Sequence, residues 1–408
     1  MNTQKNNIQT PAILLDLDAL ENNIKNFHQL AADGNKKLWP MIKTHKSTEI
    51  AHMQLDHGAT GFLCGTLDEC ETIYENLVHG ERRNINIMYA YPVAGYPNLS
   101  RVIKLAKDCK SFYLRLDDYR QCQLLNQAAA EAGVSVNYTV IINTGLNRFG
   151  IAPWEIEELM CKTASLKYLN FCGISTHPGH VYSQTTSDGI AKIAQQESDM
   201  MQNTANTLGS MGITPQLISS GSTPTYHQSA KGTVINCLHP GNYVFMDNMQ
   251  ISMGCAMEED CALTVLTTVL SAPRDGEFII DAGSKCLGLD KGGHGNEKIK
   301  GYGRIKNQKS IISAAHSNDG LLTVQALSEE VGKIVVSEKY HGKVNLKIGD
   351  KLEIIPNHSC AAANNTSYYI AVRQGIFDRL ISVDMRGNST TKGMGSNNNA
   401  RNGQKGGS

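Results

Sequence analysis

A lysine that ends an apolar run is the first residue whose position indicates chemistry. The run is Trp39-Pro-Met-Ile-Lys43-Thr-His45-Lys46. If its apolar part is a barrel strand, Lys43 lies at the carboxyl end, where barrel enzymes carry their catalytic groups. Partial burial and the neighbouring cation of Lys46 would both favour the free amine that imine chemistry requires. A lysine that ends a strand and points into water fits the spacing equally well.

Two turns of small and polar residues follow the last apolar runs of the first part of the chain. They are Ser219-Ser220-Gly221-Ser222-Thr223-Pro224-Thr225 and Pro240-Gly241-Asn242-Tyr243. Small residues let the backbone approach an anion, and exposed N–H groups and hydroxyls can bind it. In barrels, phosphate sites commonly form from the loops after strands 7 and 8. Such turns are common, so each alone is weak support for a phosphate site.

Two further strand ends carry side chains that suit an aromatic cofactor. Arg148 lies in the glycine-bounded stretch Thr144–Gly150, where its planar fork can bind a phenolate or a carboxylate. His177 ends the next apolar run, and Tyr182 follows shortly after it. A flat imidazole and a phenol can pack on an aromatic ring. A surface arginine and a structural histidine are the competing interpretations.

Pro356-Asn357-His358-Ser359-Cys360 is a candidate metal site. An imidazole and a thiolate two residues apart can face one borderline-soft ion, and Zn²⁺ is the natural choice. Two protein ligands would leave positions open for water or substrate. One such pair is a weak signal by itself.

The pattern around these residues predicts a (β/α)8 TIM-type barrel. From Thr10 to about Asn248, short apolar runs alternate with amphipathic stretches, as in a parallel sheet covered by helices. About eight units over roughly 240 residues suit a fold that needs about 250. An open doubly wound sheet is the rival, although no GxGxxG follows a first strand. The expected strands are Leu38–Lys43, Gly61–Cys64, Ile85–Ala90, Ser111–Leu116, Val136–Asn143, Phe171–His177, Gln216–Ser219 and Val234–Leu238, with helices that include Asp16–Ala32 and Cys122–Ala132.

The pattern changes after about Gly254, where turns of Gly, Asp and Asn separate strand-like runs and predict a smaller, mostly β domain. The expected strands are Leu263–Leu270, Glu277–Ile280, Lys333–Glu338 and Lys351–Ile355. Residues 388–408 are rich in Gly, Asn and Ser and should be disordered, because they cannot bury enough apolar surface to offset the ordering entropy.

The composition excludes some classes of partner. Lys and Arg balance Asp and Glu at 38 each, which gives no general electrostatic reason to bind nucleic acid or an anionic membrane. No apolar stretch approaches the roughly 20 residues of a membrane helix. The N-terminus lacks the features of a signal peptide, which predicts a cytoplasmic protein. The 11 cysteines show no CxxC and no regular spacing, so most are expected to be free thiols.

In this order, the segments resemble fold-type III pyridoxal-phosphate enzymes, the alanine-racemase-like class. The closer match is to the D-serine dehydratase and D-threonine aldolase family. The resemblance runs from Thr10 to about Gly387, nearly the whole expected ordered chain. It is carried by Thr10–Asp18, Pro40–Lys46, Ser220–Thr225, Pro240–Asp247, Asp281–Lys285 and Pro356–Cys360.

The resemblance implies a cofactor-binding barrel over residues 10–250 and a D-serine dehydratase-like β domain over 255–387, with a contribution from the N-terminal strand. It also implies a head-to-tail homodimer. Lys43 would hold pyridoxal phosphate as a Schiff base, Arg148 and His177 would lie near the ring, and Tyr182 would hold its pyridine end. The remaining implied cofactor-binding residues are Ser220, Gly221, Ser222, Thr223, Gly241, Asn242 and Tyr243, and the implied metal ligands are His358 and Cys360.

The implied substrate is a small β-hydroxy D-amino acid. In a D-serine dehydratase, Lys43 removes the Cα proton while the metal polarises the β-hydroxyl as a leaving group. A D-threonine aldolase would use the same site to release glycine and an aldehyde. Cys360 resembles the dehydratases, since aldolases often carry Asp there. A racemase would leave the His358–Cys360 pair without a purpose, and a non-catalytic cofactor carrier would be a barrel alone.

The chain departs from the family pattern at three positions. Met41 stands where the family often has histidine, and Asn143 stands where an acidic residue is more usual. Val331 stands where the family commonly has histidine, which removes a possible acid/base or metal-shell group. The last change puts the choice between dehydration and aldol cleavage in doubt.

Overall fold

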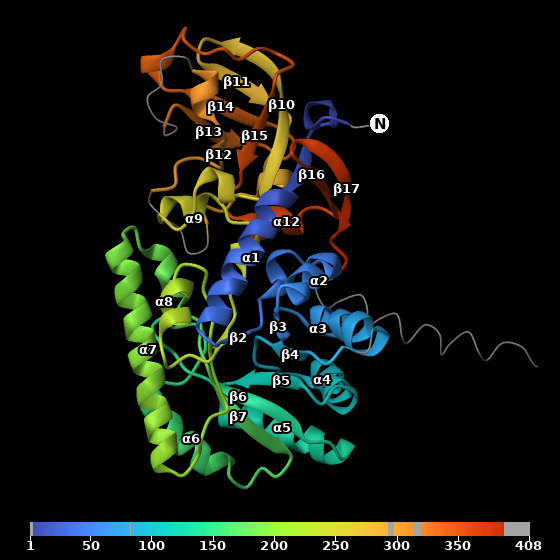
Figure 1. Cartoon of the computed structure of the whole chain (residues 1–408), viewed down its shortest axis with the longest axis vertical. Helices are drawn as coiled ribbons and strands as arrows, with labels where there is room; N and C mark the ends of the chain where they lie inside the picture. Colours follow the sequence, from blue (N-terminus) through green and yellow to red (C-terminus); the bar gives the residue numbers. More distant parts are fainter. Residues whose placement is uncertain (1–2, 82, 293–297, 313–319, 387–408) are drawn as a thin grey trace, which may run out of the picture. The chain divides into compact units, whose positions relative to one another are not determined.

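A computed structural model of the chain describes residues 3–81, 83–292, 298–312 and 320–386 (Figure 1). The expected disordered tail, 388–408, lies outside the described residues. The chain divides into two compact units. The barrel unit holds His28–Gly179, Lys192–Gly241 and the described residues from Asp384 on. The β unit holds the described residues up to Phe27, His180–Ala191 and Asn242–Val383.

The barrel unit contains the predicted parallel barrel. Its 8-stranded sheet has the order β2-β9-β8-β7-β6-β5-β4-β3, and each of these neighbouring pairs is parallel. Hydrogen bonds from Thr60 N to Leu38 O, 3.0 Å, and from Leu63 N to Pro40 O, 2.9 Å, link the two end strands. The TIM-type fold is therefore confirmed. The strands are β2 (Lys37–Leu38), β3 (Gly61–Cys64), β4 (Asn86–Tyr89), β5 (Phe112–Leu116), β6 (Val136–Ile141), β7 (Leu169–Ser175), β8 (Leu217–Ser220) and β9 (Cys237–Leu238).

The helices between these strands begin and end at the expected local signals. In α5 (Tyr119–Ala132), Asp118 caps the first turn by accepting hydrogen bonds from Arg120 N and Gln121 N. Gly133 ends the helix in the left-handed conformation, φ 65°, which glycine adopts without steric cost. The other helices wholly in this unit are α2 (Thr48–Asp56), α3 (Leu67–Ile73), α4 (Tyr96–Asp108), α6 (Ile156–Thr163) and α8 (Tyr226–Lys231). The unit boundaries fall within α1 (Leu17–Asp33) and α7 (Ser187–Ser210).

Two predicted strands are much shorter than expected, since β9 covers only the last two residues of the expected run Val234–Leu238 and the run that ends at Lys43 is interrupted. The run Leu38–Lys43 was expected to be continuous, but β2 ends at Leu38 and a 3-10 helix, η2 (Ile42–Thr44), follows. Proline at position 40 has no N–H with which to extend the ladder. The chain stays beside its neighbour through single bonds, such as Met41 N to Pro240 O at 2.9 Å. Lys43 therefore lies in a turn after the strand rather than at its last residue.

The β unit is built on a 9-stranded sheet, so the predicted β domain is also confirmed. The N-terminal strand β1 (Ala12–Asp16) lies inside this sheet, antiparallel to β10 and parallel to β16. The other strands are β10 (Leu263–Arg274), β11 (Glu277–Ile280), β12 (Arg304–Ile305), β13 (Leu322–Leu327), β14 (Gly332–Val336), β15 (Lys351–Ile355), β16 (Tyr368–Arg373) and β17 (Ile376–Ser382). Its short helices are α9 (Asn248–Ser252), α10 (Ser284–Leu287), α11 (Gln308–Ile311) and α12 (Ser359–Asn364).

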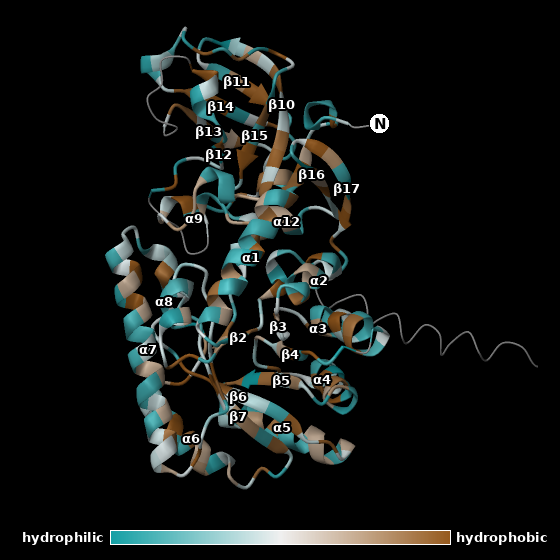
Figure 2. Ribbon diagram, in the orientation of Figure 1, coloured by the Kyte–Doolittle hydropathy of each residue, from teal (hydrophilic) through white to brown (hydrophobic). Residues whose placement is uncertain are grey.

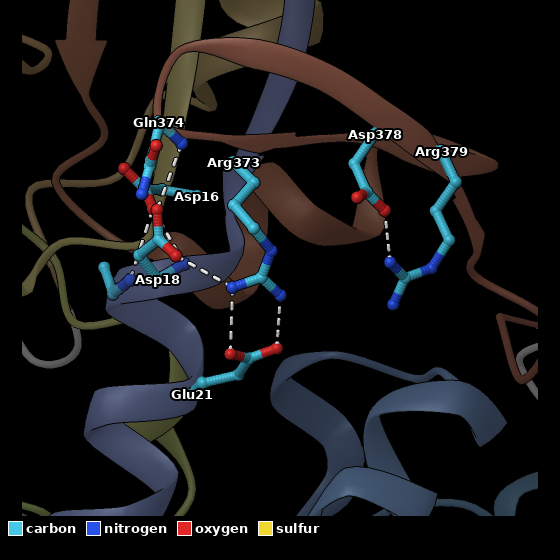
Figure 3. Close-up of polar contacts among 8 residues, drawn as sticks. Asp16, Asp18, Glu21, Arg373, Gln374, Asp378 and Arg379 are labelled. Carbon is cyan, nitrogen blue, oxygen red and sulfur yellow. Dashed lines mark hydrogen bonds and ion pairs between the residues drawn. The ribbon is translucent and has the colours of Figure 1, made fainter.

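Charged groups fasten the last hairpin of this unit to the start of α1 (Figure 3). The Arg373 guanidinium donates to both carboxylate oxygens of Glu21, at 2.6 and 3.0 Å, and to Asp18 at 2.8 Å. The side chains of Arg373 and Glu21 are both 39% exposed, so solvent screens the pair and its contribution to stability is modest.

Apolar residues gather on the strands, whereas the helices alternate between hydrophobic and hydrophilic residues (Figure 2). In the barrel unit, Trp39, Met88 and Leu217 form part of one buried cluster. None of the helices in the described ranges is long and apolar enough to cross a membrane.

Candidate active site

Lys43 is half-buried in η2, and a glycine makes room for its side chain. A Cβ added at Gly65 would lie 3.1 Å from the Cβ of Lys43 and 3.5 Å from its Cδ. The first of these contacts is tighter than ordinary packing and the second is not, so a side chain at position 65 would require the Lys43 side chain to shift slightly. Glycine just after β3 therefore allows the Lys43 side chain to lie close to the backbone.

Lys46 does not act as the isolated cation that the sequence suggested. Its Nζ lies 3.0 Å from the Glu69 carboxylate, and the two side chains are 10% and 0% exposed. Glu69 also accepts a hydrogen bond from Gly65 N at 2.5 Å. The two charges of this buried pair therefore compensate each other, and Glu69 also fixes the backbone at Gly65.

His177 is a neutral histidine surrounded by cations. Burial, followed by the charge of Lys43 and then that of Arg148, lowers its pKa to about 3. Its Nδ1 donates to the carbonyl oxygen of Gly221. Since a carbonyl only accepts, Nδ1 carries the proton and Nε2 is left as an acceptor. His177 is thus hydrogen-bonded to the loop after β8 and lies close enough to Lys43 and Arg148 for their charges to affect it.

The loop after β8, Ser220–Thr225, is here called the phosphate loop. Its Ser222, Thr223 and Thr225 hydroxyls are buried and have no hydrogen-bond partner among the described residues. A Cβ at Gly221 would lie 2.2 Å from the carbonyl oxygen of His239, so only glycine fits there. A buried hydroxyl without a partner costs about 1–3 kcal/mol, a cost that phosphate oxygens would remove. The residues present therefore fit the phosphate group of a cofactor.

The loop that carries Arg148 is organised by Asn143. The Asn143 side-chain oxygen accepts from Gly145 N at 3.0 Å and from Asn147 N at 3.1 Å. An aspartate could accept the same two bonds, so the departure from an acidic residue leaves this turn intact. Arg148 is exposed, and its guanidinium carbon lies 5.6 Å from the centre of the Phe149 ring.

Two buried polar residues in the barrel were not identified from the sequence. Arg115 on β5 is 5% exposed and donates through Nε to Ser175 Oγ at 2.9 Å. Burial lowers the pKa of this guanidinium to about 10. His239 is 3% exposed, and its Nδ1 donates to Trp39 O at 2.8 Å. Arg115 could have been identified from the sequence, because it is a charged residue within the otherwise apolar run Phe112–Leu116.

The candidate metal ligands lie in the β unit at the start of α12. Burial alone would lower the pKa of His358, but the Cys360 thiolate and then the Asp290 carboxylate outweigh it and hold the pKa well above its ordinary range. His358 Nδ1 lies 3.0 Å from Asp290 Oδ2, so Nε2 is the ring nitrogen that could bind a metal. No group of three or more His, Cys, Asp or Glu side chains suited to a metal occurs in the described part of the chain. The pair itself fits a borderline-soft divalent ion, with other positions open.

Asn242, expected to bind the cofactor, makes its side-chain hydrogen bonds near the start of α12. Its Nδ2 donates to Asp247 at 2.7 Å and to Ser359 Oγ at 2.8 Å, and lies 3.9 Å from Cys360 Sγ. The backbone N–H of Ser359 donates to the same Asp247 oxygen at 3.0 Å. Tyr243 is fully buried against Phe27, with ring centres 4.9 Å apart. These side chains make contacts within the β unit.

The structure groups the predicted site residues into two sets. Lys43, Arg148, His177, Ser220, Gly221, Ser222, Thr223 and Gly241 belong to the barrel unit, whereas Tyr182, Asn242, Tyr243, His358 and Cys360 belong to the β unit. Within the barrel unit, His177 donates a hydrogen bond to the phosphate loop, and the charges of Lys43 and Arg148 lower its pKa. Gly241 lies beside η2, since a Cβ there would be 3.2 Å from Thr44 Oγ1.

Comparison with known proteins accounts for both parts of the chain. The model of the alanine racemase N-terminal domain matches residues 15–249, and that of a serine dehydratase domain matches 262–372. A D-serine dehydratase from Dictyostelium discoideum is 29% identical over 90% of this chain and 94% of its own length. A D-threo-3-hydroxyaspartate dehydratase from Delftia sp. is 26% identical over 90% and 94%, respectively.

Solved structures agree with these matches. The crystal structure of D-threonine aldolase from Filomicrobium marinum superposes with a TM-score of 0.81 at 26% identity, covering 95% of this chain and 98% of the other. The alanine racemase model alone matches more than half of the chain. The chain therefore belongs to the alanine racemase-like, fold-type III pyridoxal-phosphate enzymes, in the family that contains the D-serine dehydratases and D-threonine aldolases.

Proposed function

We propose that this lyase is a D-serine dehydratase, which eliminates water and then ammonia from a small β-hydroxy D-amino acid. The observation that carries the proposal is the set of buried, unpartnered hydroxyls in the phosphate loop, joined by His177 to the surroundings of Lys43. This arrangement suits a cofactor with a phosphate at one end and a reactive aldehyde at the other.

Pyridoxal phosphate, when bound, supplies an electron sink for the charge that develops at the substrate Cα. Lys43 is the residue that would hold the aldehyde of the cofactor, and its free amine would take the proton from the substrate Cα. Ser222 and Thr223 would donate hydrogen bonds to the phosphate. Arg148 would offer a planar cation to the phenolate or to the substrate carboxylate. His177 remains neutral beside these cations, which avoids a further positive charge in the site.

His358 and Cys360 are the proposed ligands of a divalent metal, and we propose zinc because nitrogen and thiolate donors suit it. A metal at this pair would polarise the β-hydroxyl of the substrate as a leaving group. Asp290 holds the His358 ring, and Asp247 holds the backbone between the two ligands. We prefer elimination to aldol cleavage because Cys360 resembles the D-serine dehydratases, whereas the aldolases often carry Asp at this position.

The second candidate is D-threonine aldolase activity, which the similarity to the Filomicrobium enzyme favours. A non-catalytic cofactor carrier is the third, and the additional β domain argues against it. We also propose that Tyr182, Ser220, Gly221, Gly241, Asn242 and Tyr243 contribute to the cofactor site, and that the enzyme is a head-to-tail homodimer. Sedimentation or light scattering of the purified enzyme tests the dimer, and the cytoplasmic location stays a prediction.

Product analysis tests the reaction. The purified enzyme is incubated with D-serine and with D-threonine, with and without a chelator. Pyruvate from D-serine, and 2-oxobutyrate from D-threonine, would support dehydration, whereas glycine and acetaldehyde would establish aldol cleavage. No turnover, with the cofactor retained and its absorbance unchanged on adding either substrate, would favour the carrier. Borohydride reduction followed by peptide mass analysis should label Lys43 in an active enzyme.

A further inference from the structure

A buried carboxyl group lies directly behind the phosphate loop and has no part in the mechanism above. Glu197 on α7 is 1% exposed, and Ser220 Oγ donates a hydrogen bond to its Oε1. The Ser229 hydroxyl donates instead to the backbone carbonyl oxygen of Thr225, at 3.1 Å. The second carboxyl oxygen, Oε2, has no hydrogen-bond partner within the described ranges. Buried carboxylates normally have several donors, so this one is poorly compensated.

The surroundings of Glu197 contain hydroxyls rather than charges. Strand β8 carries no titratable side chain, and the titratable residues of α8 are Tyr226, His227 and Lys231. Only burial and the two serine hydroxyls shift the pKa of Glu197, and burial, the largest influence, raises it to about 7. Near neutral pH the group can therefore exist in either protonation state. A single added charge nearby would decide between them.

The Ser220 hydroxyl has one proton to donate. When Glu197 is ionised, that proton is committed to the carboxylate, and Ser220 can offer the loop only a lone pair. When Glu197 is protonated, its O–H can donate to Ser220 Oγ, and the serine proton becomes available to the phosphate loop. The other loop hydroxyls, those of Ser222, Thr223 and Thr225, need no such rearrangement because they lack partners among the described residues.

A bound phosphate would favour the protonated form for a second reason. A phosphate carries between one and two negative charges near neutral pH. An ionised carboxylate behind the same loop would repel it through a medium of low dielectric constant. Hydrogen-bond supply and electrostatics therefore act in the same direction. Both predict that an anion in the phosphate loop selects the neutral state of Glu197.

We infer that Glu197 is a positioning residue for the phosphate loop, which acts through Ser220 and takes up a proton when the phosphate of the cofactor binds. This inference rests on the proposed function and deepens it, because it names the residue that couples cofactor binding to pH. The proton comes from solvent and is held between Glu197 and Ser220, so no other group need change its protonation state.

The test compares wild type with Glu197→Gln, whose amide can donate to Ser220 at any pH. The full chain is stripped of cofactor and titrated with pyridoxal phosphate, and separately with inorganic phosphate, by calorimetry in buffers of different ionisation enthalpy. Inorganic phosphate cannot form an imine, so it isolates the loop from Lys43. Protonation changes of the phosphate itself are common to both proteins and cancel in the difference.

We expect wild type at pH 8 to take up close to one proton more than Glu197→Gln. Its affinity relative to the variant should fall by up to about tenfold per pH unit above 7, as linkage requires for one proton. Equal proton uptake in the two proteins would overturn the inference. If Glu197→Gln does not fold, Ser220→Ala provides the same comparison, because it removes the hydroxyl through which Glu197 acts and should lower the proton uptake.

Borohydride labelling separates this inference from the proposed function. Labelled Lys43 together with equal proton uptake would leave the cofactor assignment standing and refute the role of Glu197. An unlabelled Lys43 in wild type would remove the proposed function, and with it the basis for this inference.

Discussion

The phosphate loop and the metal pair, defined as His358 and Cys360, differ in how many of their buried polar groups have hydrogen-bond partners. In the phosphate loop, three hydroxyls are buried without partners among the described residues. Around the metal pair, Asn242, Asp247 and Ser359 donate and accept among themselves, and of the Asn242 amide only Oδ1 lacks a partner in the described residues. The hydroxyls of the first region are available to hydrogen-bond a ligand. Most polar groups of the second region instead hydrogen-bond to one another and hold the backbone between the two metal ligands.

Of all the substitutions considered, removal of Lys43 should have the largest effect on enzyme activity. Lys43→Ala should lower pyruvate formation from D-serine by about 10⁴-fold or more, because one amine both binds the aldehyde and takes the Cα proton. The phosphate loop is unchanged, so the variant should still bind inorganic phosphate. Lys37→Ala is the matched control, since that lysine is exposed on β2. Residual activity within tenfold of wild type would mean that another residue does this chemistry.

Loss of one metal ligand should come next. Cys360→Ala should lower metal content and reduce turnover by roughly 10²–10³-fold, since Lewis-acid polarisation contributes several kcal/mol. Cofactor absorbance should be retained, because the phosphate loop does not depend on this thiol. Cys161→Ala, at an exposed cysteine, is the control. A chelator should have the same effect on wild type and little further effect on the variant.

The network behind the metal pair should have a smaller effect. Asp247→Ala removes the acceptor shared by Asn242 and Ser359, and should weaken metal binding by about 10–100-fold. Metal affinity is measured by competition with a chromogenic chelator. Asp247→Asn keeps the volume and one acceptor, so it should fall between the alanine variant and wild type. Unaltered metal affinity in a folded Asp247→Ala protein would show that the network serves the fold only.

The sequence predicted some strands of the fold accurately and others poorly. Local patterns were enough for β3, β11 and β15, which match the expected runs residue for residue. The strand Leu38–Lys43 was wrong because Pro40 has no N–H with which to continue the ladder, and a 3-10 helix begins at Ile42. The proximity of Lys43 to His177 was implied by motif order, but it arises only when the barrel closes.

Side chains behind the motifs were harder to predict. Glu197 lies in a long amphipathic helix, where an acidic residue normally reads as exposed, and its burial depends on how α7 packs. Asn242 was assigned to the cofactor from its place in a small-residue turn, but its amide is used near α12. Neither position differs from an ordinary surface residue until the tertiary contacts are known. Motifs therefore identify the groups that react more readily than the groups that position them.

The smallest expected effect is a change in the free energy of unfolding. Its sign distinguishes a buried hydroxyl that lacks a partner from one that has a partner. Thr225→Val removes a buried hydroxyl that lacks a partner in the described structure while keeping the side-chain volume. The cofactor-free enzyme should gain about 1 kcal/mol in its free energy of unfolding, because an unsatisfied polar group is lost. The cofactor should bind about fivefold more weakly, because one donor to the phosphate is lost.

Thr144→Val is the matched control, since that buried hydroxyl lies 2.9 Å from Thr176 Oγ1. It should destabilise the cofactor-free enzyme by about 1 kcal/mol, because Thr176 loses its hydroxyl partner. Denaturant unfolding of both variants gives the stabilities, and fluorescence titration gives the cofactor affinities. If Thr225→Val destabilised the cofactor-free enzyme as Thr144→Val does, its hydroxyl would already be satisfied. The contrast between an open phosphate loop and a closed metal network would then fail at that residue.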